Sequence, residues 1–165
     1  MITWTRFSYI NKICLVLYSK GVGAKIHLGK NISIGKGVSF TLKRHSELVL
    51  HDSVIISSLS DIRVYENSTM SLGRNTKIDT GVRLISANGK KVITGQNVKI
   101  GLNCVLNGGG GIDIGENSSL YGNVYIRSSN HVVNGQGLFE KNSYEHKKIV
   151  IDKNSLILPF SDICF

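Results

Sequence analysis

A six-residue step recurs along the chain and constrains its fold more than any other feature of the sequence. Each step carries an aliphatic residue, then a glycine or small polar residue, then two turn residues. Successive pairs of steps begin at Leu28 and Ile34, Leu72 and Ile78, Thr94 and Ile100, and Ile114 and Leu120. Repetition at a short fixed period is typical of a solenoid, and a hexapeptide period predicts a parallel β-helix. Three six-residue sides predict a triangular coil of about 18 residues.

The repeat also predicts which side chains fill the core. The aliphatic residue of each step should face inward, and so should the residue two positions before the next step. The first set comprises Leu28, Ile34, Phe40, Leu72, Ile78, Leu84, Ile100, Leu106, Ile114, Leu120 and Ile126. The second set comprises Ile32, Val38, Val82, Val98, Cys104 and Val124. Glycine and asparagine suit the turns because they adopt positive φ at little steric cost.

Three segments interrupt the simple pattern. Residues 42–70 read as a degenerate part of the stack, in which inward positions are still predicted at Leu48, Leu50, Val54, Ile56, Ile62 and Val64. Extra residues at 86–90 and the glycine run at 108–111 are interpreted as insertions. Insertions in a solenoid leave the stack as loops, so we expect both segments to lie outside the coils.

The first 22 residues differ from the repeat and are predicted to cap the first coil, leaving 23–165 as the β-helix domain. Apolar residues at helical spacing predict a short helix or strand there: Trp4, Phe7, Ile10, Ile13, Cys14 and Leu17. The apolar run at 13–18 is too short to span a bilayer. Without a signal sequence, a cytoplasmic location is expected, with peripheral attachment to the inner face of the membrane as the alternative.

The composition of the chain limits which kinds of binding partner are expected. The formal charge of +9 reflects either a solvated surface or attraction for anionic ligands, such as a nucleotide-bearing thioester, an acidic polysaccharide or anionic lipid. Nucleic acid is disfavoured because basic and aromatic residues are not interleaved. Cys14, Cys104 and Cys164 lie far apart without metal-ligand spacing, so we expect reduced structural thiols and no metal.

The repeat stops after Ile126, and a polar segment at about 127–147 precedes a return strand at 149–151. This layout resembles the hexapeptide-repeat O-acetyltransferases of sugars and polysaccharides over roughly residues 26–151. The resemblance implies an all-β, left-handed parallel β-helix with a short N-terminal capping segment. It also implies acetyl-CoA as donor and a sugar or cell-surface polysaccharide, of the capsule or O-antigen type, as acceptor. By the same resemblance we expect a homotrimer with active sites between subunits.

The polar segment contains the candidate site residues. By resemblance His131 is the general base that takes the proton of the acceptor hydroxyl, a task that suits histidine because it titrates near neutral pH. Asn130 is expected to position the loop or the acceptor, and Tyr144 and Glu145 to bind substrate or to orient the base. His146 is a weaker candidate for shaping the acceptor pocket. The alternative for a lone loop histidine is an exposed side chain without a role, which is the interpretation of His27, His45 and His51.

Two other functions are compatible with the repeat. Members of the family usually continue with further coils that supply the donor groove, whereas this chain reads as non-repeating from Phe160 to Phe165. The alternative is therefore a shortened, catalytically inactive hexapeptide-repeat protein, and no coenzyme A contact is assigned. A zinc carbonic anhydrase of similar fold would need three converging histidines, which the spacing of His131 and His146 does not supply. The sequence does not distinguish a small sugar from a polymer, or an acetyl group from a longer acyl group.

Overall fold

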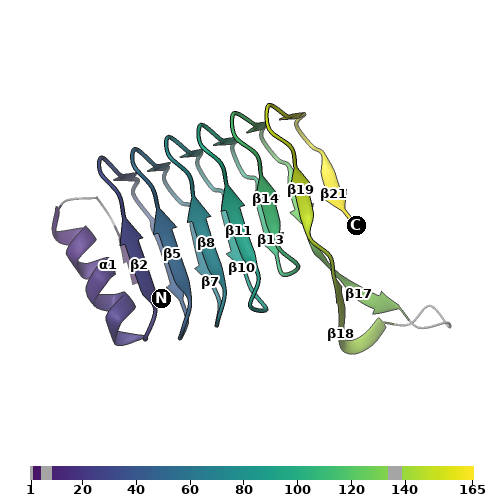
Figure 1. Ribbon diagram of the computed structural model, residues 1–165, viewed down its shortest axis with the longest axis horizontal. Helices are drawn as coiled ribbons and strands as arrows, with labels where there is room; N and C mark the ends of the chain where they lie inside the picture. Colours follow the sequence, from purple (N-terminus) through teal and green to yellow (C-terminus); the bar gives the residue numbers. More distant parts are fainter. Residues whose placement is uncertain (1, 5–8, 134–138) are drawn as a thin grey trace.

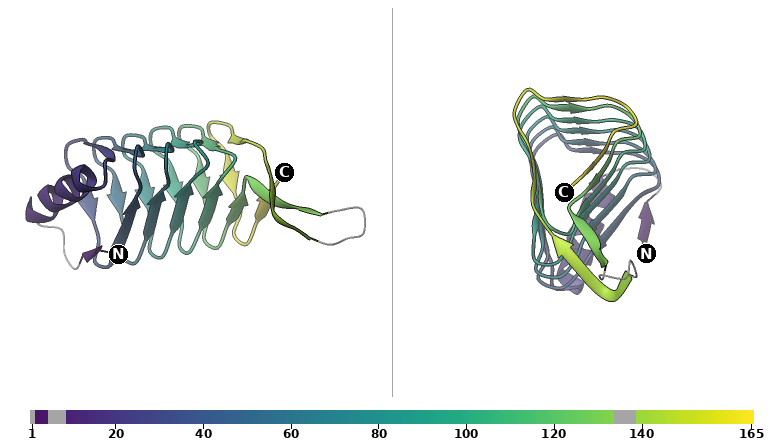
Figure 2. Two further views of the ribbon diagram at one scale, coloured as in Figure 1. Left: turned by 90° about the horizontal axis from the view of Figure 1, so that it is seen from below. Right: turned by 90° about the vertical axis from the view of Figure 1, so that its right-hand side faces the viewer.

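In the computed structural model the chain winds into a parallel β-solenoid with a helix at its N-terminal end (Figure 1). The structure describes residues 2–4, 9–133 and 139–165. Within these ranges, three sheets form the sides of a triangular prism, seen end-on in Figure 2. The prediction of a parallel β-helix is confirmed.

Sheet A has seven strands, with an antiparallel strand at its N-terminal edge. In spatial order it comprises β1 (Ile2–Trp4), β4 (Val38–Leu42), β7 (Asp61–Val64), β10 (Arg83–Ser86), β13 (Val105–Gly108), β16 (Tyr125–Arg127) and β21 (Asp162–Cys164). β1 pairs with β4 in antiparallel orientation, and the other neighbours are parallel.

Sheets B and C are parallel throughout. Sheet B comprises β2 (Lys25–Leu28), β5 (Glu47–Leu50), β8 (Thr69–Leu72), β11 (Lys91–Thr94), β14 (Ile112–Ile114) and β19 (Ile149–Ile151). Sheet C comprises β3 (Ser33–Ile34), β6 (Ile55–Ile56), β9 (Lys77–Ile78), β12 (Lys99–Ile100), β15 (Ser119–Leu120) and β20 (Leu156–Ile157). Each coil runs from sheet B to C to A, so we name its bends the B–C, C–A and A–B corners.

The coil is longer than the predicted 18 residues. Side chains stacked at the same place in adjacent coils are 22 positions apart in the first coils, as in Asn75 and Asn97, and 20 apart later, as in Asn97 and Asn117. The extra residues form a four-residue turn at the A–B corner. Equivalent backbone hydrogen bonds close this turn at 43–46, 65–68 and 87–90, with N···O distances of 3.1, 3.1 and 3.0 Å.

Two expectations are therefore wrong. Residues 86–90 are the standard A–B turn of this solenoid and not an insertion. Residues 42–70 are as regular as the rest, because β5 to β8 pair in unbroken register with the coils on either side. The six-residue pattern underestimated the coil because the long A–B turn carries no large aliphatic residue that would mark it.

The core follows the predicted alternation closely. Every residue of the two predicted inward sets is buried except Leu28, which is half-buried at the first coil, and the six inward residues of 42–70 are also buried. Like side chains stack from coil to coil, as Ile56, Ile78 and Ile100 do along sheet C. Burying each such side chain contributes about 2 kcal/mol to stability.

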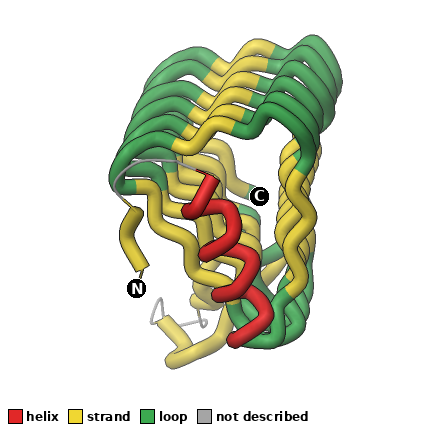
Figure 3. Tube along the Cα trace, turned by 90° about the vertical axis from the view of Figure 1, so that its left-hand side faces the viewer, coloured by secondary structure: helices red, strands yellow, loops and turns green. Residues whose placement is uncertain are grey.

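The helix α1 (Tyr9–Gly21) lies across the N-terminal end of the prism (Figure 3). Leu15 and Ser19 are buried, and Ala24 N donates to Ser19 O at 2.8 Å, which connects the helix to the first coil. Trp4 belongs to β1, so the helical spacing extends only from Tyr9 onward, while Phe7 lies outside the described residues. No helix in the described part of the chain is long and apolar enough to cross a bilayer.

Candidate functional site

The glycine run at 108–111 supports the part of the chain that leaves the solenoid. Gly110 N donates to Ser128 Oγ at 2.9 Å, and Lys147 N donates to Ser128 O at 3.2 Å. A Cβ added at Gly110 would lie 2.1 Å from Ser128 O and 2.6 Å from Lys147 O. Both ends of the departing segment therefore cross directly over Gly110, and only a glycine leaves room for them. The run is a close-packed corner of the stack, which corrects its interpretation as an outlying insertion.

The departing segment is an antiparallel hairpin of β17 (Ser129–Val133) and β18 (Phe139–His146). It projects beyond the C-terminal end of the solenoid (Figures 1 and 2). Residues 134–138 of the predicted polar loop, including Gly135 and Gly137, lie outside the described residues.

The register of the hairpin decides which candidate residues share a face. Ser129 pairs with His146, Asn130 with Glu145, and His131 with Tyr144. Because side chains alternate between the faces of a strand, the His131, Tyr144 and His146 side chains lie on one face with Ser129. Asn130 and Glu145 project from the opposite face.

The three rings form a row along the hairpin. The centroids of His131 and Tyr144 are 4.3 Å apart with an interplanar angle of 38°, and those of Tyr144 and His146 are 6.2 Å apart and stacked at 15°. His146 Nε2 lies 3.5 Å from Asn88 Nδ2, which also donates to Gly109 O at 3.1 Å. The row thus starts at the corner of the solenoid and runs outward to His131.

A cleft of about 230 Å³ opens where the row meets the solenoid. Tyr144, His146 and Ser129 line it from the hairpin, and Asn88 and Asn107 line it from the neighbouring corners. Its polar lining combines imidazole, phenol and amide groups, which can donate and accept hydrogen bonds. Such a set suits a polyhydroxylated ligand.

The structure places the predicted site residues on two opposite faces of the hairpin. Tyr144 packs against His131, as a shared role requires. Asn130 instead donates through Nδ2 to Phe165 O at 3.0 Å and so ties the hairpin to the residue that follows β21. Glu145 is exposed on the face away from the cleft. His146, the weaker candidate, lines the cleft directly.

Sequence reasoning missed Asn88 and Asn107. Both lie in other coils, and each comes to the cleft only because the coils stack in register. Asn88 and Gly89 both adopt positive φ, with values of 58° and 67°, so an Asn-Gly pair was the available signal for a turn but not for a site.

Other reactive groups of the described chain have structural explanations. Burial opposes ionisation of Asp61, but hydrogen bonds from Arg63 and Ser39 outweigh it and lower the pKa of this carboxyl. Burial raises the pKa of the Cys104 thiol, which makes it a poor nucleophile. Among the described residues, no cluster of three or more potential ligands could hold a metal ion.

The remaining histidines with described partners lie on the surface of the coils. His27 Nε2 is 3.4 Å from Glu47 Oε1, and His51 Nε2 is 3.3 Å from Ser71 Oγ. Both face outward from sheet B or its edge, away from the hairpin cleft, so the structure gives no reason to include them in the site.

Comparison with known proteins gives matches at the level of structure. No protein-family model matches the chain, and no curated protein matches its sequence. The polySia-specific acetyltransferase NeuO is similar with a TM-score of 0.57 and 17% identity, over 86% of this chain and 74% of that one. A mutant form of AntD, an N-acyltransferase from Bacillus cereus, is similar with a TM-score of 0.55 and 16% identity, over 97% of this chain and 71% of that one. That structure contains dTDP-4-amino-4,6-dideoxyglucose and coenzyme A. The chain therefore has the left-handed β-helix fold of these acyltransferases, as the repeat and its resemblance predicted.

Proposed function

We propose that this protein is an O-acetyltransferase that moves an acetyl group from acetyl-CoA to a hydroxyl of a sugar or cell-surface polysaccharide. The observation that carries the proposal is the row of His131, Tyr144 and His146 on one face of the hairpin, with a polar cleft at its base. The fold supports it, because its structural neighbours include an acetyltransferase and an acyltransferase bound to coenzyme A and a sugar nucleotide.

In the proposed reaction the acceptor oxygen attacks the thioester carbonyl carbon directly. His131 takes the hydroxyl proton as the C–O bond forms, and the resulting tetrahedral intermediate collapses with cleavage of the C–S bond. The imidazolium then returns the proton to the departing thiolate, so that the enzyme regains its starting state. Packing of Tyr144 against His131 restricts the imidazole ring, which lowers the cost of holding the base in line.

We further propose that the protein acts as a homotrimer in the cytoplasm, with at most peripheral membrane contact. The outward direction of the hairpin supports the trimer, because the hairpin reaches beyond the coils of its own chain toward space that another subunit could occupy (Figure 2). The site would then combine the hairpin of one subunit with the donor groove of the next.

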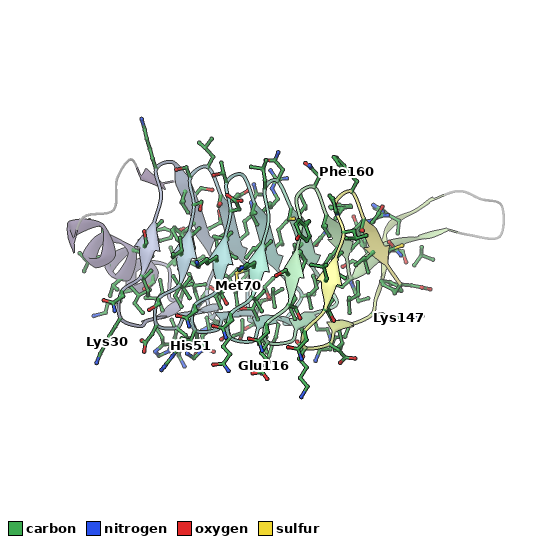
Figure 4. The ribbon with its side chains drawn as sticks, turned by 90° about the horizontal axis from the view of Figure 1, so that it is seen from above. Lys30, His51, Met70, Glu116, Lys147 and Phe160 are labelled. Atoms are coloured by element: carbon green, nitrogen blue, oxygen red, sulfur yellow. The ribbon has the colours of Figure 1, made fainter. Side chains whose placement is uncertain are left out.

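The test is the substitution His131→Gln in an assay that follows coenzyme A release. Removing a general base should lower kcat by at least about 100-fold. The circular dichroism spectrum should not change, because His131 is exposed and contributes nothing to the core. His51→Gln is the matched control, since His51 is an exposed histidine at the B–C edge (Figure 4) and should retain full activity.

Two outcomes would contradict the proposal. Full activity of the His131→Gln protein would remove His131 from the chemistry, and the His146→Gln variant would then identify the base. Calorimetry that shows no binding of acetyl-CoA to the folded, oligomeric protein would instead favour the inactive hexapeptide-repeat protein. Comparing a sugar with its amino counterpart as acceptors would decide between O- and N-transfer.

A further inference from the structure

Three adjoining cavities follow the A–B corner from the hairpin toward α1. The hairpin cleft shares Ala87 and Asn88 with a cavity of about 700 Å³, and that cavity shares Lys43 and Glu66 with a third of about 510 Å³. The third is bounded on the far side by Tyr18 of α1. Neighbouring cavities have lining residues in common and so adjoin one another along this corner; we call the three together the corner groove.

The length of the corner groove matches an extended ligand. It crosses the turns at 43–46, 65–68 and 87–90, then the glycine corner, and ends at the hairpin base. Adjacent coils are about 4.8 Å apart, so the four spacings between these five levels of the stack cover about 19 Å. Each coil therefore advances the corner by a distance similar to one pyranose unit.

The lining of the corner groove is suited to sugar units. Tyr65 and Asn67 line its middle section, as Tyr144 and Asn88 do near the hairpin. A tyrosine presents an apolar ring face with a polar tip, and an asparagine amide both donates and accepts hydrogen bonds. Similar groups thus recur at both sections, as binding of successive similar units requires.

The charge of the corner groove favours an anionic ligand. Lys43 and Arg44 are exposed at its far end, and neither takes part in an ion pair among the described residues. Lys90 lies beside it in the turn at 87–90, and Glu66 is the carboxylate in its lining. Basic groups without acidic partners raise the local concentration of anions.

We infer that the acceptor is an acidic polysaccharide whose successive units lie along the corner groove. Its acidic groups contact Lys43 and Arg44, while the hydroxyl that is acetylated lies at the ring row of the hairpin. This inference rests on the proposed function of the hairpin cleft and specifies its substrate as a polymer. A free monosaccharide would occupy only the cleft and would leave the remainder of the groove empty.

The test measures binding without acetyl-CoA, by fluorescence anisotropy of end-labelled oligosaccharides. The probes are oligosialic acid and oligogalacturonate as monomer, dimer, tetramer and octamer, with maltooligosaccharides of the same lengths as neutral probes. Affinity for at least one acidic series should rise with length up to about four units, the number of coil spacings along the groove, and then level off. Neutral probes should bind about ten-fold more weakly than acidic probes of equal length.

Charge reversal locates the binding. The double variant Lys43→Glu/Arg44→Glu should weaken binding of the acidic tetramer at least about ten-fold, because acidic groups of a ligand that spans the groove reach this end. The control is Lys77→Glu/Lys99→Glu, an equal change of charge at exposed positions on sheet C. Length-independent binding, equal binding of neutral probes, or equal effects of the two double variants would overturn the inference.

Acetyl transfer separates this inference from the proposed function. With the acidic tetramer as acceptor, Lys43→Glu/Arg44→Glu should raise KM about ten-fold and leave kcat unchanged, because the chemistry occurs at the opposite end of the groove. Length-dependent binding without transfer to any acceptor would refute the acetyltransferase and retain the groove. Transfer to monosaccharides as efficient as transfer to polymers would refute the groove and retain the acetyltransferase.

Discussion

The B–C and A–B corners are built by the same coils, yet the first repeats almost unchanged while the second changes along the prism. At the B–C corner, asparagines stack with φ between 58° and 60° at Asn75, Asn97, Asn117 and Asn154. Their amides form a ladder with N···O distances of 3.0, 2.9 and 3.3 Å. At the A–B corner, four-residue turns give way to a glycine corner and then to the hairpin.

Polar side chains at the B–C corner also interact from coil to coil. At the B–C corner Asp52 Oδ2 is 3.4 Å from Arg74 Nη2, and Gln96 Nε2 donates to Glu116 Oε2 at 3.1 Å. Figure 4 shows Lys30, His51 and Glu116 along this edge. At the A–B corner Lys43 and Arg44 form no ion pair within the described chain. At the B–C corner polar side chains pair from coil to coil, whereas the cavities of the corner groove lie along the A–B corner.

This division follows from the construction of a solenoid. Each coil contacts only its neighbours, so the three sheets and the asparagine ladder of the B–C corner can hold the stack in register. The A–B corner is then free to vary in length without disturbing the core. If the proposed function is correct, the substrate lies along a different edge of the repeat from the asparagine ladder.

The sharpest test of this comparison is Gly110→Ala at the A–B corner. The new methyl group would meet backbone atoms of Ser128 and Lys147, which cannot rotate away, so we expect a loss of about 3 kcal/mol in the free energy of unfolding and loss of acetyl transfer. Urea denaturation and the coenzyme A release assay measure the two effects.

Gly109→Ala is the matched control. Its methyl group would meet Ser129 Oγ at 2.1 Å, and a hydroxyl can turn aside, so the expected loss is only about 1 kcal/mol. Equal losses for the two variants would show that the backbone crossing over Gly110 is not what positions the hairpin.

A smaller effect is expected from Asn97→Ala at the B–C corner. Alanine removes two rungs of the ladder and is strained at φ 58°, so stability should fall by about 2 kcal/mol while acetyl transfer per folded protein is unchanged. Asn97→Gly removes the rungs without the strain and should lose about half as much. Loss of transfer in either folded variant would contradict the assignment of this corner to stability alone.

The smallest effect is a gain, expected from Leu59→Asn at the C–A corner. Leu59 is 68% exposed and has φ 60°, where Gly37, Gly81, Asn103 and Asn123 occupy the same place in other coils. Asparagine tolerates this conformation, so thermal unfolding should report a stabilisation of about 1 kcal/mol. An unchanged or lower melting temperature would show that the Leu59 side chain compensates for its strained backbone.

The sequence by itself determined the fold class and the inward face of the coils. Both depend on local alternation: an inward Val98 or Ile100 is recognised from its immediate neighbours, and its burial follows from the pleat of a short strand. The polar segment after Ile126 was likewise visible, because the repeat stops there, and the family resemblance then made His131 the candidate base within it.

Only the tertiary structure decided the coil length, the path of the hairpin and the membership of the cleft. The coil length depends on hydrogen bonds between residues 22 positions apart, such as those of Asn75 and Asn97, which a six-residue pattern does not report. The register of the hairpin separates Asn130 and Glu145 from His131. Stacking of distant coils brings Asn88 to His146. The physical reason is the same in each case: short-range periodicity specifies which way a side chain points, and long-range pairing specifies what it meets.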